Sequence, residues 1–185
     1  IKSNFNKIIL LEQIHSNKFY YINKKSKLNN NRFKGDALIT DKINTPIAVL
    51  TADCAPILIF DKKNNTVAAI HAGWKGAYKG IINKVVKFMI KKGSSTKDIT
   101  AVIGPCISLK NYEVRKEFIK KFIKKNSKNK VFFKKIRDKN YFNLNKYITY
   151  QLKSLNIKKI EVINKDTFDI KSNFLAQEDL LAVMR

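Results

Sequence analysis

The chain has 185 residues and a mass of 21.4 kDa, which suits one domain, and its apolar fraction of 44% excludes a wholly disordered protein. The longest apolar runs, such as Ile57–Phe60, are too short to cross a membrane. The formal net charge of +24 is typical of nucleic-acid-binding proteins, but only four of the 38 cationic residues are arginine. We therefore expect a solvated basic surface with no specific nucleic-acid partner and no membrane partner.

The two cysteines indicate the redox compartment. Cys54 and Cys106 occur without a recognisable secretory leader, because Ile1–Leu11 is interrupted by lysine and asparagine. We therefore expect free thiols and a cytoplasmic protein. The chain begins with isoleucine instead of methionine, so we also expect that N-terminal residues are missing.

Short apolar runs and helical periodicity predict the secondary structure. In chain order we expect strands at Lys7–Gln13, Ala37–Thr40, Ile47–Leu50, Ala55–Phe60 and Thr66–His71, a helix at Gly80–Lys92, a strand at Ile99–Ile103, helices at Glu113–Lys125 and Asn143–Leu155, and a strand at Lys159–Ile163. Residues Asp61–Asn65 predict a hairpin turn. Because strands and helices mix without strict alternation, we expect an α/β or α+β fold with a mixed sheet.

The residues that could bind a soft metal ion all lie at the ends of predicted elements. They are His15, Cys54, His71 and Cys106. Imidazole and thiolate together suit Zn²⁺, and three protein ligands leave a fourth position for water or substrate. The spacing alone is weak evidence, because no closely spaced CxxC or HxxxH pair occurs. Buried cysteines that pack as small apolar residues, and histidines that are hydrogen-bonded in the core, would explain the same pattern.

A glycine-rich segment follows the strand that ends at His71. Gly73, Gly76 and Gly80 separate this strand from the next helix, and Lys75 adds a positive charge. Free backbone N–H groups at the start of a helix, together with a lysine, suit phosphate or another anion. The segment is also typical of a tight turn with a packed tryptophan, and the pattern leaves both interpretations open.

Five motifs together resemble one known family. In chain order they are Gln13–His15, Gly35–Thr40, Thr51–Leu58, His71–Gly76 and Ile103–Ile107. In this order they closely resemble the laccase-domain family, whose members are also known as polyphenol oxidases, purine nucleoside phosphorylases or peptidoglycan-editing factors. The resemblance continues more weakly through Tyr112–Val114 and Phe142–Leu152.

This resemblance implies a fold, a metal and its ligands. It implies a single domain over residues 1–185, built from layered mixed β-sheets that are flanked by helices. It also implies a zinc ion held by His15, Cys54 and His71. Cys106 resembles a further cysteine at the rim of the site, and its role stays open.

The reaction that the resemblance implies is phosphorolysis of adenosine or inosine to the base and ribose 1-phosphate. Phosphorolysis of methylthioadenosine and deamination of adenosine are also attributed to the family. We therefore expect a purine nucleoside and phosphate as partners and zinc as the cofactor. The expected catalytic residues are Cys54, His71, Asp53 and Cys106. The expected substrate or phosphate ligands are Gly73, Trp74, Lys75, Gly76 and Asp36, and the two aspartates could equally orient the metal ligands or cap turns.

Three other functions compete with this interpretation. In the first, Cys54 or Cys106 is a nucleophile that His71 activates for hydrolytic editing of a peptidoglycan precursor. The second is copper-dependent oxidation of phenols, which needs a histidine-rich copper cluster that two histidines cannot build. In the third, the chain is a basic binding module whose metal site is a remnant.

The chain departs from the family's pattern at both ends. Only twelve residues precede Gln13, where family members usually carry several tens. Asp166–Phe168 stands where the family has Cys-Thr, and Asn173–Gln177 lacks a paired arginine. These departures predict a truncated, weakly active member with a poorer clamp on phosphate or substrate.

Overall fold

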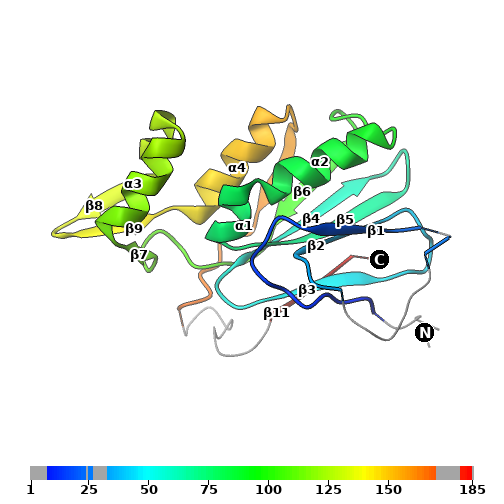
Figure 1. Cartoon of the computed structure of the whole chain (residues 1–185), viewed down its shortest axis with the longest axis horizontal. Coiled ribbons are helices and arrows are strands. Elements are labelled where there is room, and N and C mark those ends of the chain that lie inside the picture. Colours follow the sequence, from blue (N-terminus) through cyan, green and yellow to red (C-terminus); the bar gives the residue numbers. More distant parts are fainter. Residues whose placement is uncertain (1–7, 24, 27–32, 170–179, 185) are drawn as a thin grey trace.

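The computed structural model describes residues 8–23, 25–26, 33–169 and 180–184 (Figure 1). The strands are β1 (Phe19–Ile22), β2 (Ala37–Thr40), β3 (Ile47–Thr51), β4 (Ala55–Asp61), β5 (Thr66–Ala72), β6 (Ile99–Ile103), β7 (Glu113–Val114), β8 (Phe133–Ile136), β9 (Lys139–Phe142), β10 (Lys159–Val162) and β11 (Leu180–Met184). The helices are α1 (Trp74–Lys79), α2 (Ile81–Lys91), α3 (Lys116–Lys125), α4 (Leu144–Ser154) and the 3₁₀ helix η1 (Ser127–Phe132). Within these described ranges, none of the helices has the length and hydropathy that a membrane crossing requires.

A mixed six-stranded sheet forms the centre of the fold, in the order β1-β2-β5-β4-β6-β10. The inner strands β2, β5, β4 and β6 pair antiparallel, whereas β1 and β10 pair parallel with their neighbours. A second sheet pairs β3 with β11, and a third has the order β7-β9-β8. This arrangement confirms the expected mixed α/β fold with layered sheets and flanking helices.

Alternating side chains of the central sheet fill two apolar layers. Along β2, Ala37 and Ile39 belong to one buried cluster, whereas Leu38 between them belongs to the other. Helices α1, α2 and α4 cover the first face, and the β3–β11 sheet lies over the second (Figure 1). Because the sheet is covered on both faces, its inner strands carry nearly continuous apolar sequences instead of an apolar–polar alternation.

An aromatic cluster joins α3 and the third sheet to the rest of the fold. Phe122 of α3 is fully buried, and its ring centroid lies 5.0 Å from that of Phe142 and 5.3 Å from that of Tyr147. The rings of Trp74 in α1 and Phe118 in α3 have centroids 4.9 Å apart. These contacts hold α3 beside the start of α1.

Most of the predicted elements are confirmed. The strands β2 to β6 and β10 and the helices α2 and α4 lie within one or two residues of their predicted ends. The predicted hairpin turn connects β4 to β5, which pair along their full length.

The strand predicted for Lys7–Gln13 is wrong as a continuous element. Among its described residues, Ile9 forms an isolated bridge with Ile47, and Glu12 forms one with Lys34. The segment therefore changes partners along its length, so that no continuous ladder forms.

The helix predicted from Glu113 begins later, at Lys116. Glu113 and Val114 instead form β7, which pairs with Tyr141 and Asn140 of β9. The strands β1, β8 and β9 have no counterpart in the predictions, because they are short and, in β8 and β9, rich in lysine and asparagine.

Candidate metal centre

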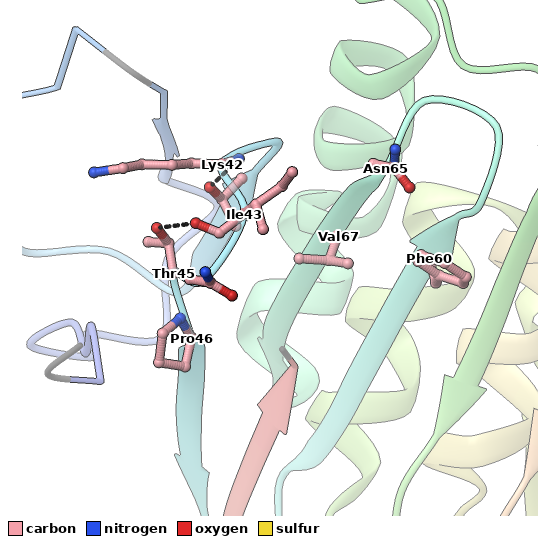
Figure 2. A pocket seen from close by; sticks show the side chains of 9 residues that line it. Lys42, Ile43, Thr45, Pro46, Phe60, Asn65 and Val67 are labelled. Atoms are coloured by element: carbon pink, nitrogen blue, oxygen red, sulfur yellow. Dashed lines mark hydrogen bonds between the residues drawn. The ribbon is translucent and has the colours of Figure 1, made fainter. Parts of the chain in front are cut away.

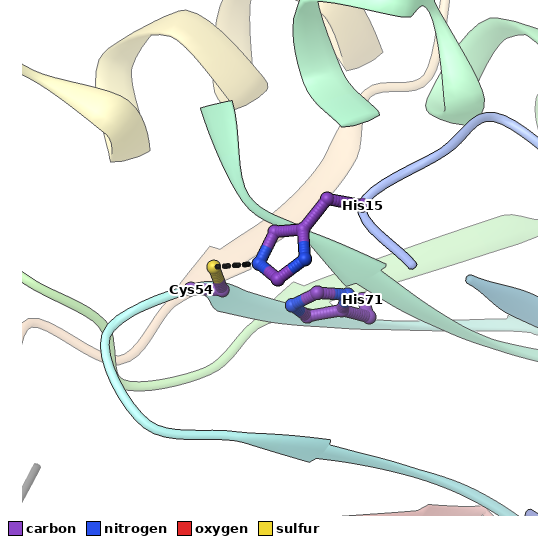
Figure 3. Close-up of side chains that lie close together, drawn as sticks. All are labelled: His15, Cys54 and His71. Atoms are coloured by element: carbon purple, nitrogen blue, oxygen red, sulfur yellow. Dashed lines mark hydrogen bonds between the residues drawn. The ribbon is translucent and has the colours of Figure 1, made fainter. Parts of the chain in front are cut away.

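Two histidines and a cysteine from three separate segments meet at one end of the β4–β5 hairpin (Figure 3). Cys54 directly precedes β4, His71 is the penultimate residue of β5, and His15 lies in the loop before β1. Their ligand atoms all lie within 4.8 Å of one another, and Cys54 Sγ is 3.7 Å from His15 Nε2. The two imidazole rings have centroids 4.7 Å apart and planes at 79°. This group could bind a metal ion.

A buried carboxylate orients both histidines. Asp36 is fully buried directly before β2, and its Oδ1 lies 2.9 Å from His71 Nδ1. The backbone N–H groups of His15 and Ser16 donate to the same carboxylate at 2.9 and 2.6 Å. Burial alone would raise the pKa of Asp36, but hydrogen bonds from His71 and Ser16 lower it to about 2. The ionised carboxylate accepts a hydrogen bond from the Nδ1–H of His71, so that Nε2 is the nitrogen that can bind a metal.

The loop that carries His15 wraps around this carboxylate. His15 has a φ of 53°, in the left-handed region that residues other than glycine rarely occupy. The N–H of Ile14 also donates to Asp36, at 3.2 Å, so three successive backbone N–H groups converge on one carboxylate. These bonds stabilise the unusual backbone and point the imidazole toward Cys54.

Two glycines allow the segments of the site to approach closely. A β-carbon at Gly73 would lie 2.5 Å from Cys54 Sγ and 3.2 Å from His15 Cδ2, so any other residue would displace the thiol. A β-carbon at Gly76 would lie 3.0 Å from the carbonyl oxygen of Ser16. Both glycines therefore let the start of α1 approach the loop of His15 and Cys54, and the phosphate-binding role expected of this segment stays a prediction.

The surroundings of the Cys54 thiol favour the binding of a cation. Burial raises the pKa of the Cys54 thiol to about 11, and the charges of Asp53 and Asp36 act in the same direction. A bound cation reverses this effect, because a coordinating thiol loses its proton.

Two lysines of α1 add positive charge to the surroundings of His15. Burial and the neighbouring His71 lower the pKa of His15, and the charges of Lys75 and Lys79 add to this effect. A lowered pKa favours the neutral imidazole, which is the form that binds metals.

Asp53 and Cys106 lie beside the group without belonging to it. Asp53 Oδ1 accepts a hydrogen bond of 3.0 Å from the hydroxyl of Thr167. Cys106 is fully buried, its thiol donates to Asn145 Oδ1 at 3.1 Å, and burial raises its pKa to about 12. The catalytic roles expected for these two residues stay predictions.

The donor set and its spacing fit Zn²⁺. A tetrahedral zinc ion with a Zn–S bond of about 2.3 Å and a Zn–N bond of about 2.0–2.1 Å places sulfur and nitrogen about 3.6 Å apart. The separation of Cys54 Sγ and His15 Nε2 is 3.7 Å. Two imidazoles and one thiolate also leave the open fourth position of a catalytic zinc site.

Two hollows differ in their distance from this group. One, of about 370 Å³, lies at the opposite end of the hairpin, and its lining includes Ile43, Phe60, Asn65 and Val67 but none of the predicted site residues (Figure 2). The other, of about 610 Å³, is lined by Trp74 of the predicted substrate segment together with residues of β7 and α3. The second hollow therefore includes one residue of the predicted substrate segment.

The three residues predicted as ligands lie together, but the sequence does not predict all of the residues that support them. Of the roles left open for Asp36, the geometry favours orientation of the proposed ligands, because its carboxylate is buried and contacts His71. Ser16 and Thr167 carried no signal, because their roles depend on contacts with residues distant in the sequence. Tyr112, which lines the hollow of about 610 Å³, lies in the segment Tyr112–Val114, where the resemblance to the family is weak.

The sequence of the chain matches a known family. Residues 1–176 match the model described as multi-copper polyphenol oxidoreductase laccase, and the chain belongs to this family. A purine nucleoside phosphorylase of Rickettsia conorii is 36% identical over 163 residues, which cover 87% of this chain and 66% of that protein. One of Clostridium acetobutylicum is 36% identical over 155 residues, which cover 83% of this chain and 63% of that protein. The chain thus spans about two thirds of the length of these curated relatives.

Solved structures show the same fold. The hypothetical protein YfiH of Bacillus licheniformis superposes with a TM-score of 0.83 at 24% identity, over 95% of this chain and 73% of that one. YlmD of Geobacillus stearothermophilus superposes with a TM-score of 0.80 at 20% identity, over 95% and 72%. At these identities the likeness establishes the architecture alone.

Proposed function

We propose that this chain is a zinc-dependent enzyme that cleaves adenosine, inosine and methylthioadenosine with phosphate. The observation that carries the proposal is the meeting of His15, Cys54 and His71, with Asp36 behind His71. The relatives named purine nucleoside phosphorylase support the reaction class.

The residues around the group have distinct roles in this reaction. Zinc, when bound, would supply a Lewis acid beside the substrate. Asp36 holds His71 in the tautomer that presents Nε2, and Lys75 and Lys79 attract phosphate to the same side as His15. Asp53, a partly exposed carboxylate next to Cys54, is the proposed acid–base group. A phosphate oxygen bonds to C1′ of the sugar, the bond from C1′ to the base breaks, and the base departs with a proton.

The same site is proposed to deaminate adenosine. In this reaction water adds at C6 of the purine and ammonia leaves, so that adenosine becomes inosine. Deamination needs no phosphate, and the phosphate dependence of the products therefore separates it from phosphorolysis.

Hydrolysis by a cysteine nucleophile has less support. A nucleophilic cysteine depends on a lowered pKa. Burial raises the pKa of Cys54 to about 11, and Cys106 is fully buried. Within the described residues no feature favours this alternative over a metal centre.

The test is a product assay on protein of measured zinc content. Adenosine, inosine and methylthioadenosine are each incubated with and without phosphate, and the products are separated by chromatography. We expect phosphate-dependent release of the base that is lost in His71→Ala. Thr66→Ala, at a buried polar position at the other end of β5, is the matched control and retains turnover. A zinc-loaded wild-type chain that releases no base with phosphate contradicts the proposal.

A further inference from the structure

Positive charge is concentrated in one part of the chain. Residues 115–139 contain twelve of the 38 cationic residues but only two acidic ones, Glu117 and Asp138. The cations are about three times as dense here as in the rest of the chain, so an even bias toward lysine does not account for them. These residues form α3, η1, β8 and the turn that leads into β9, which lie at one end of the molecule (Figure 1). We call this part the basic lobe.

The charges of the basic lobe lie on its surface and do not hold it together. All twelve cationic side chains are exposed. The interior is aromatic instead: Phe122 is fully buried, and its ring stacks on that of Phe118 with centroids 4.7 Å apart. Among the described residues, these cations form one ion pair, in which Lys139 Nζ lies 2.8 Å from a carboxylate oxygen of Glu113. Most of the positive charge of the lobe therefore faces solvent.

A stripe of lysines runs along α3. Lys116, Lys120 and Lys124 are four residues apart, so they share one face of the helix and follow one another at about 6 Å along its axis. Like charges at this spacing destabilise a helix, and a lysine in the first turn also opposes the helix dipole. Lys121 and Lys125 instead pack on aromatic rings of α1. A polyanion bound along the stripe would relieve the repulsion between its lysines.

The surface of the lobe suits phosphates that are held in a regular array. Ten of the twelve cations are lysine, which meets a phosphate as a point charge. Single strands stack their bases on exposed aromatic rings, but every aromatic side chain of residues 115–139 is at least partly buried. Helices that bind membranes insert a large apolar face, but that face of α3 packs into the core. A nucleic-acid duplex therefore fits this surface better than a single strand or a lipid surface.

The form of the duplex matters for a helix that presents charge. The major groove of B-DNA is about 12 Å wide and admits an α-helix, whereas that of an RNA duplex is too narrow for side chains to read. The exposed cations Lys134, Lys135 and Arg137 of β8 and its turn add charge beside α3. Phe133 of β8 and Phe118 of α3 have ring centroids 6.0 Å apart, so the two elements move as one surface.

We propose that the basic lobe binds double-stranded DNA through its phosphates, with the lysine stripe of α3 along the major groove and without readout of the bases. This inference goes beyond the proposed function and does not depend on the metal centre.

The test measures the affinity of the whole chain for a DNA duplex by fluorescence anisotropy, at salt concentrations between about 50 and 200 mM. The stripe variant carries Lys116→Gln, Lys120→Gln and Lys124→Gln. We expect it to bind at least tenfold more weakly than the wild type at about 100 mM salt. Its plot of log affinity against log salt should be shallower by about 3, because three phosphate contacts are lost.

The matched control removes the same charge outside the lobe. It replaces three exposed lysines of α2, in the changes Lys84→Gln, Lys87→Gln and Lys91→Gln. We expect it to lose no more than about threefold in affinity and to keep the salt dependence of the wild type. The melting temperatures of both variants are measured, and the stripe variant should be as stable as the wild type, because it loses a repulsion between exposed side chains.

Four outcomes overturn the proposal. Equal losses in the two variants would show that net charge alone binds DNA, and unchanged affinity in the stripe variant would show that α3 takes no part. Tighter, stripe-dependent binding to a single strand or to an RNA duplex would overturn B-DNA as the partner, and so would tighter binding to vesicles that contain phosphatidylserine. Should the stripe variant not fold, Lys120→Gln alone must still bind DNA more weakly than Lys87→Gln.

Discussion

Asp36 receives hydrogen bonds from both sides of the metal group, from the imidazole of His71 and from the backbone of the His15 loop. Partners of this kind fix the tautomer and orientation of a ligand, and their loss typically weakens metal affinity about 10–100-fold. We expect Asp36→Asn to weaken zinc affinity by about this factor, because an amide cannot accept hydrogen bonds from all of these N–H groups. The measurement is zinc affinity by competition with a chromogenic chelator.

The control for this substitution is Asp41→Asn. Asp41 follows the other end of β2 and accepts a hydrogen bond from Tyr21. Asp41→Asn therefore removes the same negative charge at a position distant from the proposed ligands. Equal zinc affinities of the two variants would contradict the positioning role of Asp36.

Gly73 gives a second prediction for a single residue. In Gly73→Ala the new methyl group occupies the space of Cys54 Sγ, so we expect zinc affinity to fall by at least tenfold while the chain stays folded. Gly80→Ala is the control. Gly80 has open space around it but a φ of 83°, which alanine rarely adopts. This substitution should therefore lower thermal stability without changing zinc affinity. Retention of wild-type zinc affinity by Gly73→Ala would show that the thiol is not a ligand in this arrangement.

Among the elements, the β4–β5 hairpin positions two of the three proposed ligands, and Asp61 stabilises its turn. Asp61 is fully buried and accepts hydrogen bonds from the backbone of Lys63 and from the backbone and side chain of Asn64. Burial would raise the pKa of Asp61, but these hydrogen bonds lower it below its usual value. The stabilisation is therefore fully present above the unfolded-state pKa of about 3.9 and is lost as the pH falls through the lower folded-state pKa.

We expect Asp61→Asn to lower the free energy of unfolding at pH 7 by roughly 1–3 kcal/mol and to have a smaller effect near pH 3. Urea denaturation at both pH values measures this difference. Asp138→Asn, at an exposed turn between β8 and β9, should be neutral at both. An Asp61→Asn deficit that stays constant with pH would show that the charge of Asp61 does not stabilise the turn.

The predictable elements were those with a strong local pattern. The buried strands of the central sheet and the helices α2 and α4 follow from apolar runs and helical spacing. Glu113 and Val114 continue a helical pattern, but pairing with β9 overrides it. Local patterns limit the prediction of the site in the same way. His15, Cys54 and His71 could be predicted from residue type and from the family resemblance. The burial of Asp36 could not, because it depends on how distant segments pack.

For the whole molecule, the net charge of +24 has a consequence that is independent of the metal centre. We expect weak binding to any DNA duplex, with an affinity that falls steeply between 50 and 200 mM salt and shows no preference for sequence. Fluorescence anisotropy with two unrelated duplexes measures this. Strong discrimination between the duplexes at the higher salt concentration would contradict a solvated basic surface.

We propose that His15, Cys54 and His71 together bind one zinc ion. Zinc per chain, measured by mass spectrometry of the metal after dialysis against a weak chelator, tests it most directly in the wild type, in Cys54→Ala and in the matched control Cys106→Ala. We predict one zinc ion in the wild type and in Cys106→Ala, and loss of zinc from Cys54→Ala. Stoichiometric zinc in a folded Cys54→Ala chain, or none in the wild type, would contradict the account.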